Sequence, residues 1–396
     1  MRGAYRGIPD PQGLVMKATT HVLLISDQAA PNLLAALDPD LKPKEAVLVT
    51  SRKMRRRAEA LGGVLRDVGI TVETVNLDDE HDFAGLEAAL LDIAGVRNGP
   101  SVALNVTGGT KLMALAAKSV ADTANWSVFY VDVDTDEMIV LGQGRPTRRK
   151  LSEHLRLRHY LRSYGFEIEG DIARRGLEPR HRELLQTLII QVGRMEQALG
   201  QLNGLGQDCE NKRALRTGLS PTQLDNPDLN ALLRNFEGAE VLRVTGDTLQ
   251  FTSEADRAFA CGGWLEQYMY DALTEAHGEL GVRDKASNLT VADGSGVKNE
   301  IDVAFLARNR LFMVECKTAR MDRPESPKAN ETLFKLSEIS KRVGGLGARG
   351  MLATYRPLRE SERRLANALN IEVICGAELA QTRERLKRWV GPQVGS

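Results

Sequence analysis

The stretch "EIDVAFLARNRLFMVECKT", residues 300–318, decides the fold of the second half of the chain. Ile301, Val303 and Phe305 alternate with Asp302, Ala304 and Leu306, and a second apolar run covers 311–314. Both runs have the length and composition of β-strands, and the residues between them, 307–310, suit a hairpin turn. We therefore expect two antiparallel strands that pair with each other.

The polar residues of this hairpin are predicted to share one face. With a turn centred on residues 309–310, Asp302 lies opposite Lys317 and Ala304 lies opposite Glu315. Because side chains alternate between faces with a period of two, Asp302, Glu315 and Lys317 point to the same side. A turn longer or shorter by two residues leaves this result unchanged. Cross-strand neighbours lie about 4.5–8 Å apart, which is close enough for two carboxylates to share one cation.

Two carboxylates at that separation suit the hydrolysis of a phosphodiester. They hold a hard divalent ion such as Mg²⁺ or Mn²⁺ and leave positions for water and a phosphate oxygen. A lysine beside them orients or deprotonates the attacking water and offsets the charge that develops on phosphorus. Asp302 and Glu315 are thus candidate metal ligands, and Lys317 is a candidate catalytic group. The alternative is an exposed sheet face with a cross-strand ion pair between Asp302 and Lys317.

This arrangement resembles the metal-dependent PD-(D/E)xK nucleases, although Ile301 stands where the family name has proline. The resemblance implies that the helix before the hairpin carries Glu266 as an accessory acid. It also implies that the helix after the hairpin carries Lys335 as an auxiliary polar residue. We expect the main-chain carbonyl of Cys316 to complete the metal site.

Residues 21–143 alternate strand and helix signals. Near-continuous apolar strands between amphipathic helices are typical of a parallel sheet that is covered on both faces. The sequence therefore predicts a Rossmann-like α/β domain, in which ligands bind at the carboxyl ends of the strands. The expected strands of this sheet are residues 21–26, 45–51, 70–77, 101–106 and 126–134.

The loop "NVTGGTK", Asn105–Lys111, follows one of these strands and has the character of an anion site. Gly108 and Gly109 permit a tight turn and a close approach to a ligand, and Thr107 and Thr110 offer hydroxyls. The helix that follows points free N–H groups outward, which suits a phosphate. The loop is neither a P-loop nor a GxGxxG loop. The alternative is a tight turn that only caps the helix.

Polar residues also gather where the first two strands end: Ser26, Asp27, Gln28, Thr50, Ser51, Arg52 and Lys53. With "NVTGGTK", they resemble the CRISPR-associated Rossmann-fold (CARF) sensors over residues 20–145. The resemblance implies that these residues bind a cyclic oligoadenylate. Joined to the nuclease motif, the chain resembles the CARF–PD-(D/E)xK effectors of type III CRISPR defence, with cyclic tetra-adenylate as the expected activator.

Composition limits the possible classes of protein. The chain has 396 residues, enough for two or three domains, and a net charge of zero, so binding to nucleic acid must depend on local patches. Its four cysteines form no CxxC pair and are expected to be reduced thiols. There is no apolar run of transmembrane length and no signal-peptide core. We therefore expect a cytoplasmic protein without a membrane partner.

The predicted organisation has four parts: a disordered N-terminus (1–19), the CARF domain (20–145), a connecting region (146–253) and the nuclease domain (254–396). The connecting region is expected to contain one long helix at 179–202 and a hairpin at 239–252. These elements suit either a winged helix or a spacer that carries movement from the sensor to the nuclease. The basic stretch 145–163 suits either contact with nucleic acid or a linker helix.

The expected function is cleavage of DNA or RNA by a homodimer that a cyclic oligoadenylate activates. Two alternatives remain open at this point. One is a DNA-repair or restriction-type nuclease whose Rossmann domain senses nothing. The other is a transcription regulator that responds to the same ligand without catalysis.

Overall fold

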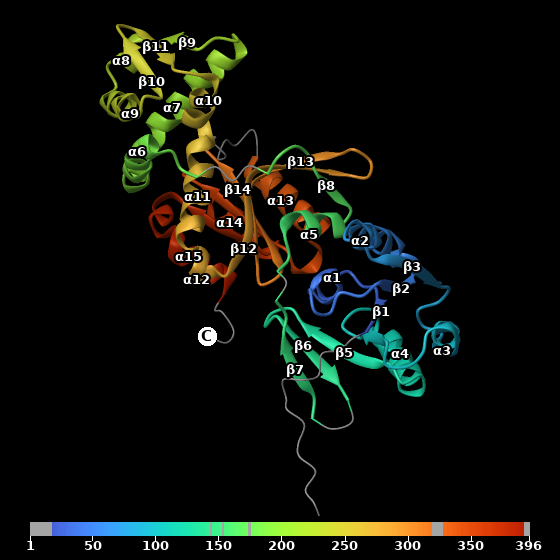
Figure 1. Ribbon diagram of the computed structural model, residues 1–396. Coiled ribbons are helices and arrows are strands. Elements are labelled where there is room, and N and C mark those ends of the chain that lie inside the picture. The colour runs from blue at the N-terminus through green and yellow to red at the C-terminus, as the bar shows by residue number, and fades with distance from the viewer. Residues whose placement is uncertain (1–17, 143–144, 153, 173–175, 319–327, 392–396) are drawn as a thin grey trace, which may run out of the picture. The chain divides into compact units, whose positions relative to one another are not determined.

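The computed structural model describes residues 18–142, 145–152, 154–172, 176–318 and 328–391. The expected disorder at 1–19 thus lies almost wholly outside the described residues. The chain forms two compact units, one extending to Glu167 and the other comprising most of the chain from Ile168 onward (Figure 1). Within the described ranges, no helix is both long enough and apolar enough to span a bilayer.

The first unit is built on a seven-stranded sheet in the order β3-β2-β1-β4-β5-β6-β7. The first five strands run parallel, as the sequence predicts, and the last two add antiparallel to the edge. The strands are β1 (Thr20–Leu24), β2 (Glu45–Ser51), β3 (Thr71–Leu77), β4 (Val102–Asn105), β5 (Ser127–Asp132), β6 (Glu137–Leu141) and β7 (Thr147–Lys150). The neighbours β2, β1 and β4 therefore end at one edge of the sheet.

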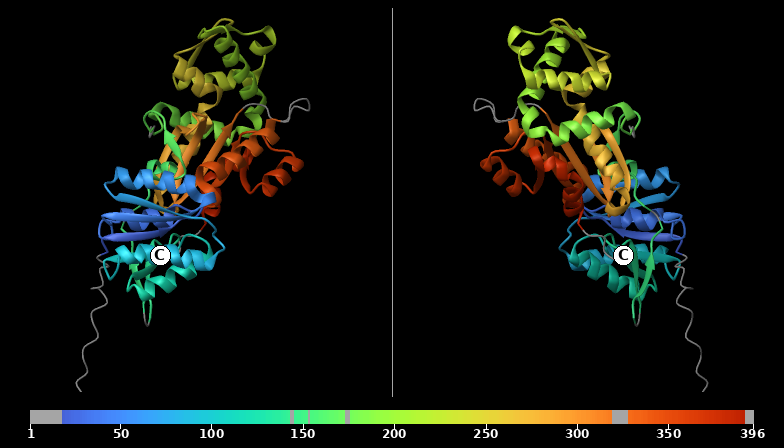
Figure 2. Two further views of the ribbon diagram at one scale, coloured as in Figure 1. Left: turned by 90° about the vertical axis from the view of Figure 1, so that its right-hand side faces the viewer. Right: turned by 90° about the vertical axis from the view of Figure 1, so that its left-hand side faces the viewer.

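Helices cover both faces of this sheet (Figure 2). They are α1 (Ala30–Leu37), α2 (Arg55–Asp67), α3 (Phe83–Val96), α4 (Lys111–Thr123) and α5 (Leu157–Ser163), with a 3₁₀ turn η1 (Arg52–Met54). Helices α3 and α4 share a hydrophobic core with Val22, Leu24 and Val47 on one face. Part of the basic stretch 145–163 is built into this unit, because β7 joins the sheet and α5 buries Leu157.

The second unit contains a mixed sheet in the order β16-β15-β14-β13-β12-β8. Its strands are β8 (Phe166–Ile168), β12 (Val282–Asp293), β13 (Lys298–Ala307), β14 (Arg310–Lys317), β15 (Arg349–Thr354) and β16 (Ile371–Cys375). Strands β12 to β14 are antiparallel, whereas β14 to β16 are parallel. The carboxyl ends of β14, β15 and β16 consequently lie at the same edge.

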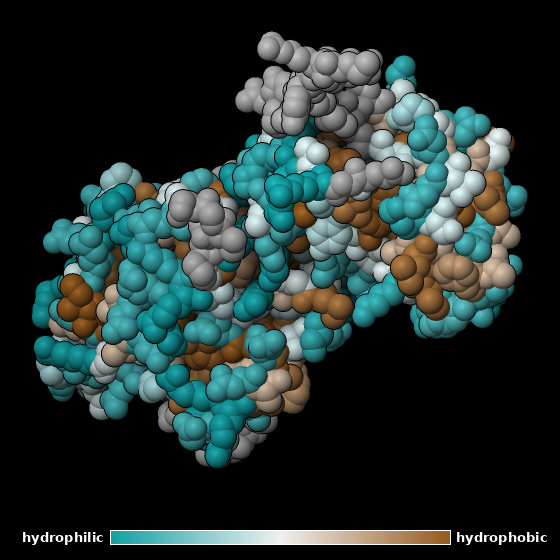
Figure 3. Space-filling view, turned by 90° about the horizontal axis from the view of Figure 1, so that it is seen from below, coloured by the Kyte–Doolittle hydropathy of each residue, from teal (hydrophilic) through white to brown (hydrophobic). Residues whose placement is uncertain are grey.

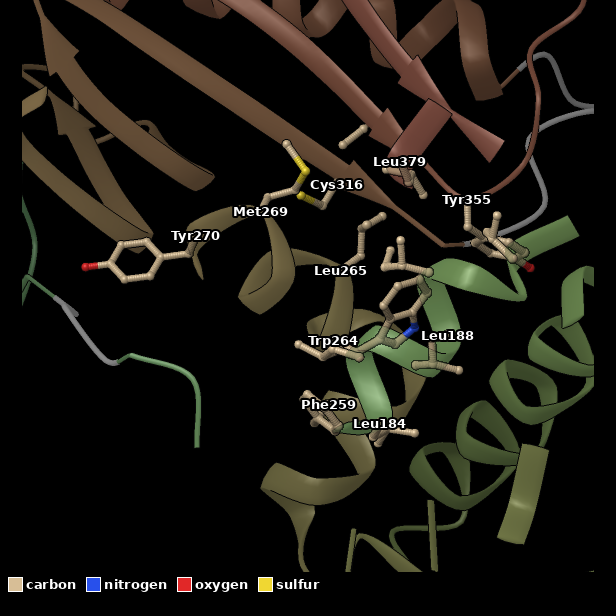
Figure 4. Packing of buried hydrophobic residues seen from close by; sticks show 14 of the residues in the cluster. Leu184, Leu188, Phe259, Trp264, Leu265, Met269, Tyr270, Cys316, Tyr355 and Leu379 are labelled. Atoms are coloured by element: carbon tan, nitrogen blue, oxygen red, sulfur yellow. The ribbon is translucent and has the colours of Figure 1, made fainter. Parts of the chain in front are cut away.

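The helices that follow residue 253 in this unit are α10 (Glu254–Ala258), α11 (Trp264–Glu275), α12 (His277–Leu280), α13 (Lys328–Gly344), α14 (Glu360–Ala368) and α15 (Thr382–Val390). A π-helical turn, η2 (Phe259–Gly263), joins α10 to α11, and 3₁₀ turns η3 (Gly345–Gly347) and η4 (Gly376–Gln381) follow α13 and β16. Figure 4 shows Trp264 and Leu265 of α11 packed among side chains from several elements, including Leu188 and Tyr355. This core fixes the helix that carries Glu266.

The connecting region contains α6 (Pro179–Ile190), α7 (Val192–Asn211), β9 (Arg216–Gly218), α8 (Pro221–Leu224), α9 (Pro227–Gly238), β10 (Leu242–Thr245) and β11 (Thr248–Phe251). The prediction of one helix over 179–202 is wrong, because Gln191 takes a non-helical conformation between α6 and α7. The β-branched Ile190 and Val192 and the glycine at 193, which are weak helix formers, surround this break. The hairpin predicted at 239–252 is confirmed.

Residues 192–251 form what we call the intermediate module. Its three strands pair in the order β10-β11-β9, so the first strand lies beside the last. Two helices, α8 and α9, lie between the first and second strands in the sequence. A helix, a strand, two helices and a closing hairpin in this order define the topology of a winged helix.

Candidate active site and ligand loop

The hairpin of β13 and β14, which carries the candidate catalytic residues, turns through two residues, Arg308 and Asn309. Both have positive φ, 52° and 56°, as a two-residue turn of type I′ requires. The register therefore places Ala304 opposite Met313. The predicted pairing of Ala304 with Glu315 is wrong by two residues, because the turn lies earlier than the expected centre at 309–310.

The predicted shared face survives this change, because a shift of two residues leaves every side chain on its own side. The ladder between β13 and β14 extends as far as Val303 opposite Val314. Continuing the same register places Asp302 opposite Glu315. At this point the carboxylate of Asp302 accepts a hydrogen bond from the Cys316 N–H, with 2.6 Å from Oδ2 to N.

The structure brings Asp302, Glu315 and Lys317 together at the end of the hairpin. Lys317 Nζ lies 2.6 Å from Glu315 Oε1 and 4.0 Å from Asp302 Oδ2. The carboxylate side chains are only 13% and 15% exposed, whereas that of Lys317 is 35% exposed. Two nearly buried acids thus share one lysine, which remains accessible from solvent.

The pKa values of these groups show the cost of burying negative charge. Burial, followed by the charge of Glu315, raises the pKa of Asp302 to about 6. Burial opposes the charged form of Lys317, but Glu315 and Asp302 outweigh this effect and its pKa is raised. The site is therefore short of positive charge, and a bound cation would relieve the deficit.

Glu266 and Lys335 approach the same region from two helices. Glu266 lies in the first turn of α11, and burial followed by the charge of Asp302 raises its pKa to about 7. Lys335, on α13, lines a small hollow together with Glu315 and Glu300. Both helices therefore place the predicted side chains near the two carboxylates.

Glu300 was not among the candidate residues, although it lies on the same face as Asp302. The period of two that groups Asp302 with Glu315 also includes residue 300, so the pattern contained this signal. Glu300 is exposed, and its charge helps to raise the pKa values of Glu266 and Asp302. It adds to the negative potential at the mouth of the site.

The donor atoms at this site suit a hard divalent cation. Asp302 and Glu315 offer carboxylate oxygens, which Mg²⁺ and Mn²⁺ prefer over the thiolate and imidazole ligands typical of zinc sites. In the described part of the chain, no three His, Cys, Asp or Glu side chains are arranged to hold a metal by themselves. A cation here would take its other ligands from the main chain and from water.

The loop Asn105–Lys111, which we call the ligand loop, needs its two glycines for the path of its backbone. A Cβ on Gly108 would collide with the Leu24 carbonyl oxygen, and Gly109 has a positive φ of 74°. The next residue, Thr110, is the N-cap of α4, and its hydroxyl accepts a hydrogen bond from the Met113 N–H at 3.2 Å. The loop thus leads directly into α4, and the first N–H groups of α4 lie at the edge of the sheet where the strands end.

Several of the predicted ligand residues use their polar atoms inside the protein. The amide nitrogen of Asn105 donates to the Asn32 side chain at 2.9 Å, and its oxygen accepts from the Thr107 hydroxyl at 2.6 Å. Thr107 in turn accepts from the Val131 N–H at 2.7 Å. Thr50 is fully buried, and its hydroxyl donates to a main-chain carbonyl. These side chains shape the loop and strand ends.

Apart from Ser51, the remaining predicted residues lie nearer the surface of the same edge. Ser51 is almost fully buried, whereas Ser26 and Asp27 are partly exposed. Lys53 pairs with Glu80 at 3.1 Å. The side chains of this edge with the greatest exposure are those of Gln28, Arg52, Lys53 and Lys111. Cationic and amide groups are thus available beside the loop.

Family models match both ends of the chain. Residues 20–160 match the Card1 CARF domain, and residues 253–392 match the Card1-like endonuclease domain. No curated protein matches the chain.

Solved structures resemble the chain over nearly its whole length. Protein VC1899 from Vibrio cholerae is 24% identical with a TM-score of 0.83, and the match covers 94% of this chain and 97% of that one. Can2 from Sulfobacillus thermosulfidooxidans, solved with cyclic tetra-adenylate, is 25% identical with a TM-score of 0.77, covering 96% and 99%.

A type III CRISPR defence DNA nuclease activated by cyclic oligoadenylate shares the fold at 17% identity and a TM-score of 0.51. That match covers 94% of this chain and 50% of the other. Together, the two family models assign both ends of the molecule: a CARF domain is joined to a Card1-like endonuclease domain, and the chain belongs to the Card1-like CARF–nuclease proteins.

Proposed function

We propose that this protein is a metal-dependent nuclease that a cyclic oligoadenylate, cyclic tetra-adenylate in particular, activates for the cleavage of DNA or RNA in the cytoplasm. The observation that carries the proposal is the shared face of Asp302, Glu315 and Lys317 inside a domain of the endonuclease family. The complex of Can2 with cyclic tetra-adenylate supports the choice of activator. Cleavage of plasmid DNA and single-stranded RNA with Mn²⁺, with and without the activator, tests it.

The roles of the catalytic residues follow from their positions. Asp302, Glu315 and the Cys316 carbonyl would hold Mg²⁺ or Mn²⁺, which when bound acts as a Lewis acid on the phosphate. Lys317, accessible and paired with Glu315, orients the attacking water and offsets charge on the phosphate oxygens. Glu266, with its raised pKa, is able to accept or donate a proton near neutral pH.

Removing one metal ligand is expected to abolish cleavage. Asp302→Asn keeps the shape of the side chain but removes the charge that holds the cation, and EDTA should have the same effect on the unmodified protein. Cleavage assays measure the loss, and calorimetry with cyclic tetra-adenylate verifies that the sensor still binds. Undiminished cleavage in EDTA would exclude the two-carboxylate mechanism.

The stability of the metal-free protein should depend on the protonation of Glu266. Because its pKa is raised in the folded state, the stability it contributes is complete below its ordinary pKa and is lost as the pH rises through about 7. Glu266→Gln should therefore raise the melting temperature in EDTA more at pH 7.5 than at pH 5.5. Each pKa unit corresponds to about 1.4 kcal/mol, so a difference of several degrees is expected.

The exposed Glu360, on α14, provides the matched control for this measurement. Glu360→Gln should change the melting temperature equally at both pH values. If Glu266→Gln gave the same shift at pH 5.5 as at pH 7.5, the carboxyl group of Glu266 would not be strained by burial.

The ligand loop should be needed for activation but not for catalysis. A cyclic oligoadenylate presents phosphates around a ring, and Thr110, Lys111 and the loop N–H groups offer donors to them. We expect Thr110→Ala combined with Lys111→Ala to remove activation while leaving the basal metal-dependent cleavage. Cleavage is measured with and without cyclic tetra-adenylate.

Loss of the α4 cap is a separate effect of this double variant, worth about 1 kcal/mol. Thr110→Ser keeps the hydroxyl and the cap, and it should retain activation. If calorimetry shows no binding of any cyclic oligoadenylate to the unmodified protein, the sensor proposal fails, and a repair-type or restriction-type nuclease becomes the better description.

One ligand loop reaches only part of such a ring, so we propose that two CARF domains meet it as a two-fold dimer. The first turns of α4, directly after the loop, expose Leu112 (36%) and Leu115 (62%). Phe83 at the start of the neighbouring α3 is 39% exposed. In the view of Figure 3 the surface is mostly hydrophilic, with hydrophobic side chains in a few small patches. An apolar group beside the ligand loop therefore suits a subunit contact.

Leu115→Glu is expected to weaken this dimer, because it places a charge in the apolar contact. Sedimentation velocity in the presence of cyclic tetra-adenylate should show a larger monomer fraction. Val96, 76% exposed at the far end of α3, supplies the control, since Val96→Glu lies away from the carboxyl edge of the sheet. Equal effects of both substitutions would exclude α4 as the contact.

A further inference from the structure

The intermediate module, residues 192–251, has the topology of a winged helix but not the charge of a module that binds nucleic acid. It carries eight acidic and six basic side chains. Affinity for nucleic acid comes largely from cations that neutralise phosphates, so this balance disfavours docking on a phosphate backbone. The contacts of its long helix α7 indicate a different role.

Helix α7 is attached to the carboxyl ends of two strands of the nuclease sheet. The side-chain amide of Asn203 donates to the Thr318 carbonyl oxygen, which follows β14, at 3.0 Å. About two turns earlier on the helix, Glu196 Oε1 forms an ion pair with Nη1 of Arg356, at a distance of 3.2 Å. Arg356 lies just beyond the end of β15. Gly200 leaves room for this arginine, because a Cβ there would lie 3.0 Å from Nη2.

Thr318 joins the two elements that carry the catalytic groups. It comes directly after Lys317, it is 7% exposed, and its hydroxyl donates to the Cys261 carbonyl oxygen at 3.1 Å. Cys261 lies in the π-helical turn η2, immediately before the helix that carries Glu266. At the next residue, Gly262, a Cβ would meet the Thr318 hydroxyl at 2.9 Å, so the absence of a side chain allows this close approach.

Asn203, on α7 of the intermediate module, also binds Thr318. Its nitrogen lies 3.0 Å from the Thr318 carbonyl oxygen and 3.4 Å from the Thr318 hydroxyl. Among the described residues, its amide oxygen is buried without a hydrogen-bond partner, so the amide acts as a donor alone. The hydrogen bonds that its nitrogen donates are both directed at Thr318, at the end of the strand.

We propose that Asn203 is a positioning residue of the nuclease, which holds Lys317 in register with Glu266 by fixing Thr318. This inference rests on the proposed nuclease function. Displacing a catalytic group by about 1 Å can cost up to about 10²-fold in rate. Loss of the Asn203 bond should therefore lower kcat and leave the KM for nucleic acid unchanged, because Asn203 touches the strand end and not the substrate.

The test compares Asn203→Ala and Asn203→Asp with Asn230→Ala. Asn203→Asp keeps the shape but places an acceptor against the Thr318 carbonyl oxygen, so it should be at least as harmful as alanine. Asn230, in the same module, donates to the Leu224 carbonyl oxygen at 2.6 Å and, within the described ranges, bonds to neither β13 nor β14, which makes Asn230→Ala the matched control. All assays use the full chain with Mn²⁺ and cyclic tetra-adenylate, below the melting temperature of every variant.

The expected result is a kcat about 10-fold or more lower for both Asn203 variants, an unchanged KM, and activity within twofold of normal for Asn230→Ala. Thr318→Val, which keeps the shape without the hydroxyl, should share the defect, and Thr318→Ser should restore it. Hydrogen–deuterium exchange should show faster exchange at residues 315–318 and 261–266 in the Asn203 variants and in Thr318→Val, and not in Asn230→Ala. This second readout does not require activity, so it separates a failure of the inference from a failure of the proposed function.

Two outcomes would overturn the inference. Equal losses of activity for Asn203→Ala and Asn230→Ala, in proportion to their melting temperatures, would show that the module acts only through stability. A raised KM with an unchanged kcat would show instead that Asn203 belongs to a substrate-binding surface.

Discussion

The hydrogen bond from the Cys316 N–H to the Asp302 carboxylate is the contact around which the nuclease site is organised. The main-chain ladder between β13 and β14 extends as far as Val303 and Val314. Beyond it, the Asp302 side chain accepts the hydrogen bond of a β14 N–H group in place of a main-chain carbonyl. This hydrogen bond fixes the orientation of the Asp302 carboxylate among apolar neighbours. Glu315 lies opposite it on β14. The hydrogen bond also helps Asp302 to tolerate burial, as the pairing with Lys317 does for Glu315.

The protein's own positive charge compensates only part of the negative charge that is buried at this site. One lysine faces two nearly buried carboxylates, and Glu266 and Glu300 add further negative potential. Such an arrangement is costly for a purely structural ion pair, because both charges lose their hydration. The cost is intelligible if the site is built for a state in which a divalent cation is present.

Much of this architecture follows from local patterns in the sequence. The parallel strands of the first unit were predictable because they are apolar runs separated by amphipathic helices, and the shared face of Asp302 and Glu315 depended only on a period of two. The register of the hairpin was not predictable, because it depends on Arg308 and Asn309 adopting positive φ, which arginine rarely does. The helix break at Gln191 was missed for a related reason, since it depends on packing around α6 and α7 and not on a proline.

The ligand loop shows a second limit. Asn105, Thr107 and Thr110 look alike as polar residues in the sequence, yet Asn105 and Thr107 bond to each other and to buried neighbours. Sequence alone does not separate hydroxyls and amides that build a loop from those that meet a ligand, because both require the same residue types. The distinction needs the path of the backbone around Asn32 and Val131.

The contact of Gly108 with the Leu24 carbonyl oxygen has a consequence for how this family of sensors can diversify. A position at which even a methyl group collides with the main chain of the central strand is closed to gradual variation. Substitutions that preserve the path of this loop are therefore those at the exposed rim, where Gln28, Arg52 and Lys111 can be exchanged one at a time. A side chain at Gly108, by contrast, would force the main chain of the loop to move.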